Sequence, residues 1–122
     1  MERIEEFELQ GKNFMYIDFS NLMTNSDFIS LTENIEPMIA KYPEHSLYTV
    51  TNIANVRFDS KSTDLVIRYM KNNKPYVKFG AVIGLDGIKK LMVSTIVKLS
   101  GRSNMHFAFT REQAIEWLLQ QD

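Results

Sequence analysis

The spacing of apolar residues changes along the chain between the two-residue repeat of strands and the roughly 3.6-residue repeat of helices. Apolar segments with strand-like spacing occupy residues 4–9, 14–19, 47–53, 76–83 and 105–109. Segments with helical spacing follow the last four of these, beginning near residues 25, 60, 87 and 110. The pattern therefore predicts a leading strand and four successive strand–helix units.

Strands that alternate with helices favour right-handed crossovers and a mostly parallel sheet. The turn Gln10-Gly11-Lys12-Asn13 indicates that the first strand instead folds back on the second as a hairpin. The predicted fold class is α/β, a mostly parallel four-stranded sheet with an added N-terminal antiparallel hairpin strand. Residues 1–122 are expected to form a single domain, because no linker or low-complexity tract divides them.

Helix ends can be predicted from capping residues and from proline. Asp59, Ser60 or Ser62 can cap the second helix by accepting a hydrogen bond from a free N–H in its first turn. Gly101 is a typical residue at which the third helix would end. Pro37 lies within the first helical segment, and its missing N–H is expected to kink or split that helix.

The third helix is apolar around more of its circumference than a helix that covers one side of a sheet usually is. Val93 and Val97 extend its apolar arc to roughly 240° at about 100° per residue, whereas a sheet-covering helix needs a little over 100°. The excess is expected to be buried by another helix of the chain, a second subunit or a lipid. The predicted core face consists of Ile88, Leu91, Met92, Ile96 and Leu99.

Basic residues accompany this apolar arc, and the two halves of the chain differ in charge. Residues 1–61 contain five Lys/Arg and ten Asp/Glu, a net charge of −5, while residues 62–122 contain nine and five, a net charge of +4. This imbalance fits either a solvated face or a positive surface for an anionic membrane, an acidic partner or a second copy. Lys90, Val93, Val97 and Arg102 are the candidate interface residues.

Composition excludes several kinds of function. The chain has no cysteine, which rules out a disulfide framework and a thiol nucleophile. Its N-terminal residues are acidic, whereas a signal peptide begins with basic residues and continues with an apolar stretch. No apolar run approaches the ~20 residues of a membrane span. A pI near 6.1 without a basic, aromatic motif disfavours nucleic acid binding. A cytoplasmic domain is expected.

Polar residues at the ends of predicted strands are the candidates for chemistry. Asp18, Ser20, Asn52 and Asp59 should meet at the carboxyl edge of the sheet, where open α/β folds bind ligands. No histidine or lysine is placed by sequence to activate Ser20, however, so ordinary turn and capping roles are the favoured explanation. The sequence predicts no catalytic site, metal site or cofactor.

The two histidines do not change this interpretation. His45 belongs to a predicted surface loop, and His106 alternates opposite the apolar face of the last strand, at the surface or beneath a helix. Histidines in these positions form no constellation for metal binding or general-base catalysis.

Three segments resemble the SpoIIAA-like superfamily, which includes the STAS domains of anti-sigma-factor antagonists and of anion transporters. These segments are LYTVTNIANVRFDSKSTDL, YVKFGAVIGLDGIKKL and HFAFTREQAIEWL. The last two are similar to small stand-alone bacterial members of unsettled function. The resemblance implies a regulatory domain that binds a protein partner or its own copy as a homodimer.

The resemblance also raises the question of phosphorylation. Phospho-switched members have a D-S-S-G-like turn whose serine accepts phosphate at a helix N-terminus. In this chain Asp59-Ser60-Lys61-Ser62 occupies the turn, so that Lys61 or Ser60 falls on the phosphorylated position and the glycine is missing. This departure argues against a phospho-switch. The architecture is shared with lipid-binding CRAL-TRIO domains, which implies a lipid or a small apolar or anionic ligand as the alternative.

Overall fold

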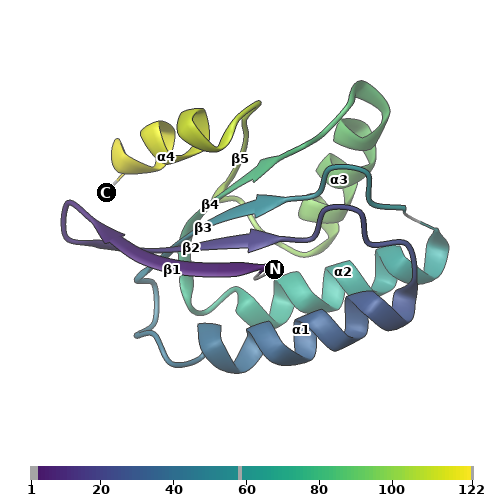
Figure 1. Ribbon diagram of the computed structural model, residues 1–122, viewed down its shortest axis with the longest axis horizontal. Coiled ribbons are helices and arrows are strands. Elements are labelled where there is room, and N and C mark those ends of the chain that lie inside the picture. The colour runs from purple at the N-terminus through teal and green to yellow at the C-terminus, as the bar shows by residue number, and fades with distance from the viewer. Residues whose placement is uncertain (1–2, 58, 122) are drawn as a thin grey trace.

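A computed structural model describes residues 3–57 and 59–121 as a five-stranded sheet with four helices (Figure 1). The strand order is β1-β2-β3-β4-β5, in which β1 pairs antiparallel with β2 and the other pairs are parallel. This confirms the predicted fold class. The elements are β1 (Ile4–Leu9), β2 (Lys12–Asp18), α1 (Asn25–Ile39), β3 (Leu47–Asn52), α2 (Ser60–Asn73), β4 (Val77–Ile83), α3 (Gly87–Leu99), β5 (Met105–Phe107) and α4 (Arg111–Leu119).

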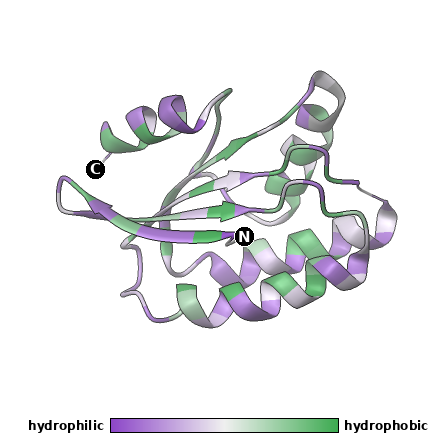
Figure 2. Cartoon of the chain, viewed as in Figure 1, coloured by the Kyte–Doolittle hydropathy of each residue, from purple (hydrophilic) through white to green (hydrophobic). Residues whose placement is uncertain are grey.

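The β1–β2 hairpin closes through a tight turn at Gln10 and Gly11, which both have positive φ angles. β1 forms one edge of the sheet and is largely hydrophilic (Figure 2), since Glu5, Glu6 and Glu8 lie on it. Charged side chains on an edge strand disfavour pairing with the edge of another sheet. The three-residue β5 forms the other edge.

The helices cover the two faces of the sheet unequally. α1, α2 and α3 connect sequential parallel strands and lie on one face, while α4 lies on the other (Figure 1). Right-handed crossovers between successive neighbouring strands place their helices on the same side. Two apolar clusters result. The larger is built around Met15, Ile17, Phe19, Ile35, Ile39, Leu47 and Val82, and the smaller around Phe14, Tyr48, Val50, Ala81, Ala114 and Leu118.

α1 does not split at Pro37, although a split was one of the two outcomes expected from the sequence. The proline lies inside a helix that continues to Ile39. Its missing N–H removes one hydrogen bond, to the carbonyl four residues earlier, and the helix ends two residues after it. Gly101 ends α3 as expected, with φ +77°, a conformation that glycine adopts without steric cost.

The predicted core face of α3 is wrong at Leu91, Met92 and Leu99 and correct at Ile96. Leu91 and Leu99 are 74% and 59% exposed and Met92 is also exposed, while Val93 is 7% exposed and Ile96 2%. Ile88 lies among the residues whose side chains the structure does not describe. Because the apolar arc is so wide, the sequence pattern fits several orientations of the helix, and packing between α2 and the sheet selects the face that carries Val93.

This orientation of α3 predicts a large loss of stability for one substitution and almost none for another on the same helix. Val93→Glu should lower the free energy of unfolding by more than ~3 kcal/mol, because it buries a charge without a partner. Leu91→Glu should change it by less than ~0.5 kcal/mol, because the side chain is exposed. Urea denaturation followed by circular dichroism measures both values. Equal destabilisation by the two variants would contradict the orientation.

Candidate functional site

The residues predicted to meet at the carboxyl edge of the sheet do so in part. Asp18 and Asn52 are register partners in neighbouring parallel strands. Asp18 Oδ1 accepts a hydrogen bond from the Ser20 backbone N–H at 2.8 Å, and Asn52 Oδ1 accepts one from the Ala54 N–H at 3.0 Å. Asn52 Nδ2 also donates to the Tyr16 hydroxyl at 3.1 Å. These polar atoms stabilise the turns after β2 and β3, and the contacts indicate a structural role.

The loops that follow β2, β3 and β4 are held close together beyond this edge. Asn21 and Asn55 both have left-handed backbone conformations, and Asn55 Nδ2 donates to Asn21 Oδ1 at 3.2 Å. Gly84 has φ +85°, and a Cβ added there would lie 2.6 Å from Asn52 Oδ1 and from the Ala54 backbone nitrogen. No larger residue fits this position without moving the neighbouring loop.

Asp59 caps α2, and it is one of the three capping residues that the sequence allowed. Its carboxylate accepts a hydrogen bond from the Ser62 N–H at 2.8 Å, and the Asp59 N–H donates to Ser62 Oγ at 2.6 Å. The two residues thus form a reciprocal capping box. Ser62 is 6% exposed, whereas Ser60 and Lys61 are exposed. Asp59, Ser60 and Ser62 form one local cluster at the start of α2.

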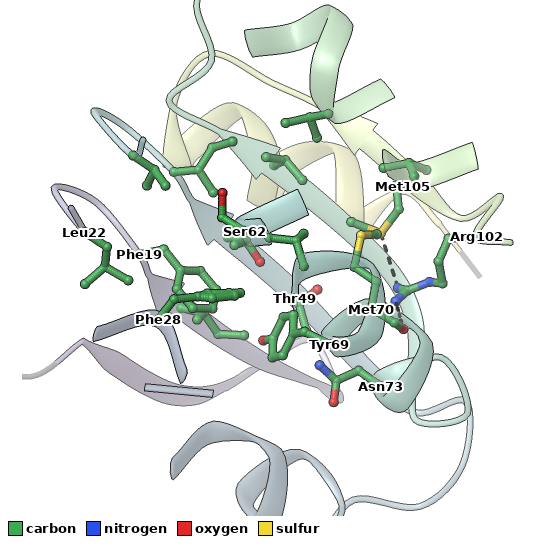
Figure 3. A pocket seen from close by; sticks show the side chains of 18 of the residues that line it. Phe19, Leu22, Phe28, Thr49, Ser62, Tyr69, Met70, Asn73, Arg102 and Met105 are labelled. Carbon is green, nitrogen blue, oxygen red and sulfur yellow. Dashed lines mark hydrogen bonds between the residues drawn. The ribbon is translucent and has the colours of Figure 1, made fainter. Parts of the chain in front are cut away.

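A cavity of about 100 Å³ lies between the sheet and the three helices that cover this face. Most of its wall is apolar (Figure 3), and Phe19, Phe28 and Tyr69 form a cluster of rings with centroids 5.3–6.2 Å apart along one side. Ser62 lines the cavity, whereas Asp18, Ser20 and Asn52 do not. Further apolar walls are provided by Ile17, Ile53, Val66, Met70, Val77, Val82, Val93 and Val97.

Several polar side chains line this apolar space. Thr49 and Thr51 project into it from β3, and Tyr69 and Asn73 lie one turn apart on α2. Burial raises the pKa of the Tyr69 hydroxyl above its usual range, the charge of Glu36 adds to this rise, and the charge of Arg102 opposes it. A largely apolar pocket with a few converging polar groups is typical of small-molecule sites.

Two charged residues line the cavity. Arg57 is exposed, whereas Arg102 is buried and only 7% exposed. Its Nε donates to Asn104 Oδ1 at 2.9 Å, Nη1 to the Met70 carbonyl oxygen at 3.3 Å, and Nη2 to the sulfur of Met105 at 3.2 Å. Burial lowers the pKa of the guanidinium, and the nearby Tyr69 raises it. Each of these hydrogen-bond acceptors is neutral.

The four candidate interface residues do not form one exposed surface. Val93 and Arg102 are buried, Val97 is half-buried, and both valines line the cavity, so the part of the apolar arc that carries them is covered within the chain. Lys90 is exposed, with Nζ 5.9 Å from the centre of the Phe107 ring. The exposed apolar residues of α3 are instead Leu91, Met92 and Leu99, here called the α3 stripe.

The histidines take the positions expected from the sequence. His45 is exposed in a loop, and His106 stacks on Trp117 of α4 with ring centroids 4.2 Å apart. Within residues 3–57 and 59–121, no group of three or more histidine, aspartate or glutamate side chains is placed to hold a metal ion. None of the helices in this described part of the chain is long and apolar enough to cross a membrane.

The sequence did not identify the cavity, although one signal for it was present. Leu47, Thr49, Thr51 and Ile53 alternate on one face of β3, which places two threonines where a buried face usually carries larger apolar residues. Tyr69 and Asn73, four residues apart on one helix face, are a weaker signal.

Comparisons with known proteins bear on the fold. No family model matches the chain, and no curated protein matches it. A solved structure of an anti-sigma-factor antagonist (STAS) domain protein from Planctomyces limnophilus matches with a TM-score of 0.59 and 12% sequence identity, covering 94% of this chain and 97% of that one. The chain has a STAS-type, SpoIIAA-like fold. The resemblance drawn from the sequence is thereby confirmed at the level of the fold.

The capping box predicts different effects for the two serines at the start of α2. Ser62→Ala should lower the free energy of unfolding by about 1 kcal/mol, because a buried hydroxyl that both donates and accepts is lost. Ser60→Ala should lower it by less than ~0.5 kcal/mol, because Ser60 is exposed. Urea denaturation of both variants tests this order, and the reverse order would contradict it.

The same cap predicts a pH dependence of stability. The hydrogen bond from the Ser62 N–H holds the pKa of Asp59 below its ordinary value of 3.8. A carboxyl with a lower pKa in the folded state stabilises the fold above its unfolded pKa, and this contribution is lost as the pH falls through the folded pKa. Asp59→Asn, which can still cap the helix, should therefore lose less stability than the wild type below about pH 4. If the free energy of unfolding changes with pH in the same way in the two proteins, the lowered pKa of Asp59 does not contribute to stability.

Proposed function

We propose that this domain acts by binding a protein partner and not by catalysis. The observation that carries the proposal is the α3 stripe, in which Leu91, Met92 and Leu99 are exposed on one helix. Large apolar side chains gathered on a surface are typical of interaction sites. The structural neighbour is described as an anti-sigma-factor antagonist, a role defined by its effect on another protein.

The charges around the α3 stripe suggest the chemistry of the partner. Lys90 and Lys98 are exposed on the same helix, and between Arg68 and Arg102 the sequence contains eight basic residues and one acid. A partner with an acidic rim around an apolar patch would complement this surface. In an isologous dimer through α3, lysines of the two copies would be brought close together. This repulsion favours a different protein over a second copy.

The start of α2 argues against a phosphate switch at Ser60 or Ser62. The carboxylate of Asp59 already occupies the position where a phosphate would accept hydrogen bonds from the first turn. A phosphate on Ser60 would face this negative charge, and the Ser62 hydroxyl is buried within the capping box. We therefore propose a partner-binding domain that phosphorylation of this turn does not control.

A second candidate function is binding of a small apolar ligand, and the cavity is the observation that favours it. A cavity of about 100 Å³ with mainly apolar walls is comparable with engineered cavities of ~150 Å³ that bind benzene or xenon. Xenon-129 NMR would test for such a site. We expect a saturable shift in the wild type that Val97→Phe abolishes by filling the space, and an unchanged shift in Val97→Phe would contradict this candidate.

The protein-binding proposal can be tested at the α3 stripe. A photo-crosslinking amino acid at Leu91 should capture one partner in cells, whereas the same probe at Ile29, an exposed apolar position on α1, should not. Leu91→Glu combined with Leu99→Glu should weaken binding of the purified partner at least tenfold, because apolar contact is lost and negative charge is added. Isothermal titration calorimetry measures the affinity, and circular dichroism checks the fold.

Three outcomes would overturn this proposal. The probes at Leu91 and Ile29 could capture the same proteins, or the double variant could bind the partner as tightly as the wild type. Sedimentation could instead show that the wild type self-associates and that the double variant is a monomer, in which case the occupant of the α3 stripe is a second copy.

Ser60→Asp should leave the affinity within about twofold, and a larger change would restore the phosphate switch.

A further inference from the structure

Arg102 is a buried cation at the end of an apolar cavity without an acidic partner among the described residues. The ion pair of the described residues joins Arg111 to Glu5, which is elsewhere in the fold. The charge of Glu36 raises the pKa of Tyr69 in this cavity, but the Glu36 carboxylate accepts a hydrogen bond from Asn72 at 2.8 Å. Buried charges in proteins are usually paired, because an unpaired charge in a low-dielectric interior is costly.

The hydrogen bonds of Arg102 leave two of its N–H groups unused. A guanidinium has five N–H groups, and the contacts to Asn104, Met70 and Met105 use three of them. One of these acceptors is a thioether sulfur, which is a weak acceptor. The Met70 carbonyl lies in the last turn of α2, so this bond also caps the helix and offsets part of the charge.

Arg102 places a buried charge at one end of the cavity. The exposed Arg57, whose backbone N–H donates to the Leu22 carbonyl oxygen, lies near the other end, which is otherwise mainly apolar. Arg102, Met105 and Asn73 lie at one end, and Phe19, Phe28 and Leu22 at the other (Figure 3). Tyr69 lies between them and interacts electrostatically with Arg102. A molecule with an apolar body and one anionic group matches this distribution. Guanidinium groups bind carboxylates through two parallel hydrogen bonds.

We propose that the cavity binds a short carboxylate with a single ring or a small alkyl chain, and that Arg102 holds the carboxylate group. This inference rests on the second candidate function, because it assigns a charge to the ligand of the same cavity. The volume of about 100 Å³ sets the size of the apolar body near that of benzene. The chain of a long fatty acid exceeds this space.

The test compares charged and neutral probes of the same shape. Isothermal titration calorimetry with benzoate, benzamide, hexanoate and 1-hexanol should show each carboxylate binding at least tenfold more tightly than its neutral counterpart. Palmitate should bind more weakly than hexanoate. In two-dimensional NMR, benzoate should shift the Arg102 Nε–H resonance more than benzamide does.

Four variants assign the effect to residues. Arg102→Gln should weaken benzoate binding at least tenfold and leave 1-hexanol binding within about twofold, and Arg102→Lys should retain part of the preference for carboxylates. Val97→Phe should abolish binding of all four small probes. Lys98→Gln removes an exposed charge next to Val97 and should leave every affinity unchanged. If Arg102→Gln does not fold, the wild-type comparison and Val97→Phe still decide the question.

The outcomes separate this inference from the candidate function on which it rests. If carboxylates and neutral probes bind with equal affinity and Val97→Phe abolishes their binding, Arg102 has no role in binding and the cavity takes apolar ligands only. Absence of binding for all probes would overturn both. Palmitate binding more tightly than hexanoate would overturn the assignment to a short acid in favour of a long-chain lipid.

Discussion

The right-handed crossovers between β2, β3, β4 and β5 determine most of what this molecule can do. The parallel strands follow one another in sequential order, so α1, α2 and α3 cover the same face and leave the other to α4. The larger core, the cavity and the exposed α3 stripe all lie on the three-helix side. This chirality also brings residues that are distant in the sequence, such as Phe19, Tyr69 and Arg102, to one space.

The cavity lies where β3 presents two threonines to α2. Thr49 and Thr51 line it from β3, and Gly80 on β4 is the register partner of Thr49. A Cβ added at Gly80 would lie 2.8 Å from the Thr49 hydroxyl and 2.9 Å from the Met105 sulfur, so this part of the sheet accepts no larger residue without rearrangement. Cores are normally packed to crystal-like density, and unfilled apolar space lowers stability. A ligand that fills the space would offset this cost.

The two proposed binding activities use different parts of α3. Val93 and Val97 line the cavity, while Leu91, Met92 and Leu99 face outward from the same helix. A ligand that moved α3 relative to α2 would therefore also move the α3 stripe. Such a shift would couple the two sites, because the free energy of one binding event would then depend on the other.

The sequence alone determined the order of the elements, the hairpin and the parallel sheet, and it narrowed the cap of α2 to Asp59, Ser60 or Ser62. These features depend on local periodicity, turn residues and side-chain hydrogen bonds a few residues apart. The sequence also predicted the STAS-type fold. The tertiary structure alone decided which face of α3 is buried and that Arg102 lies inside. An apolar arc of about 240° fits several orientations, and the environment of a cation depends on which elements surround it. Both are settled by packing between residues far apart in the chain.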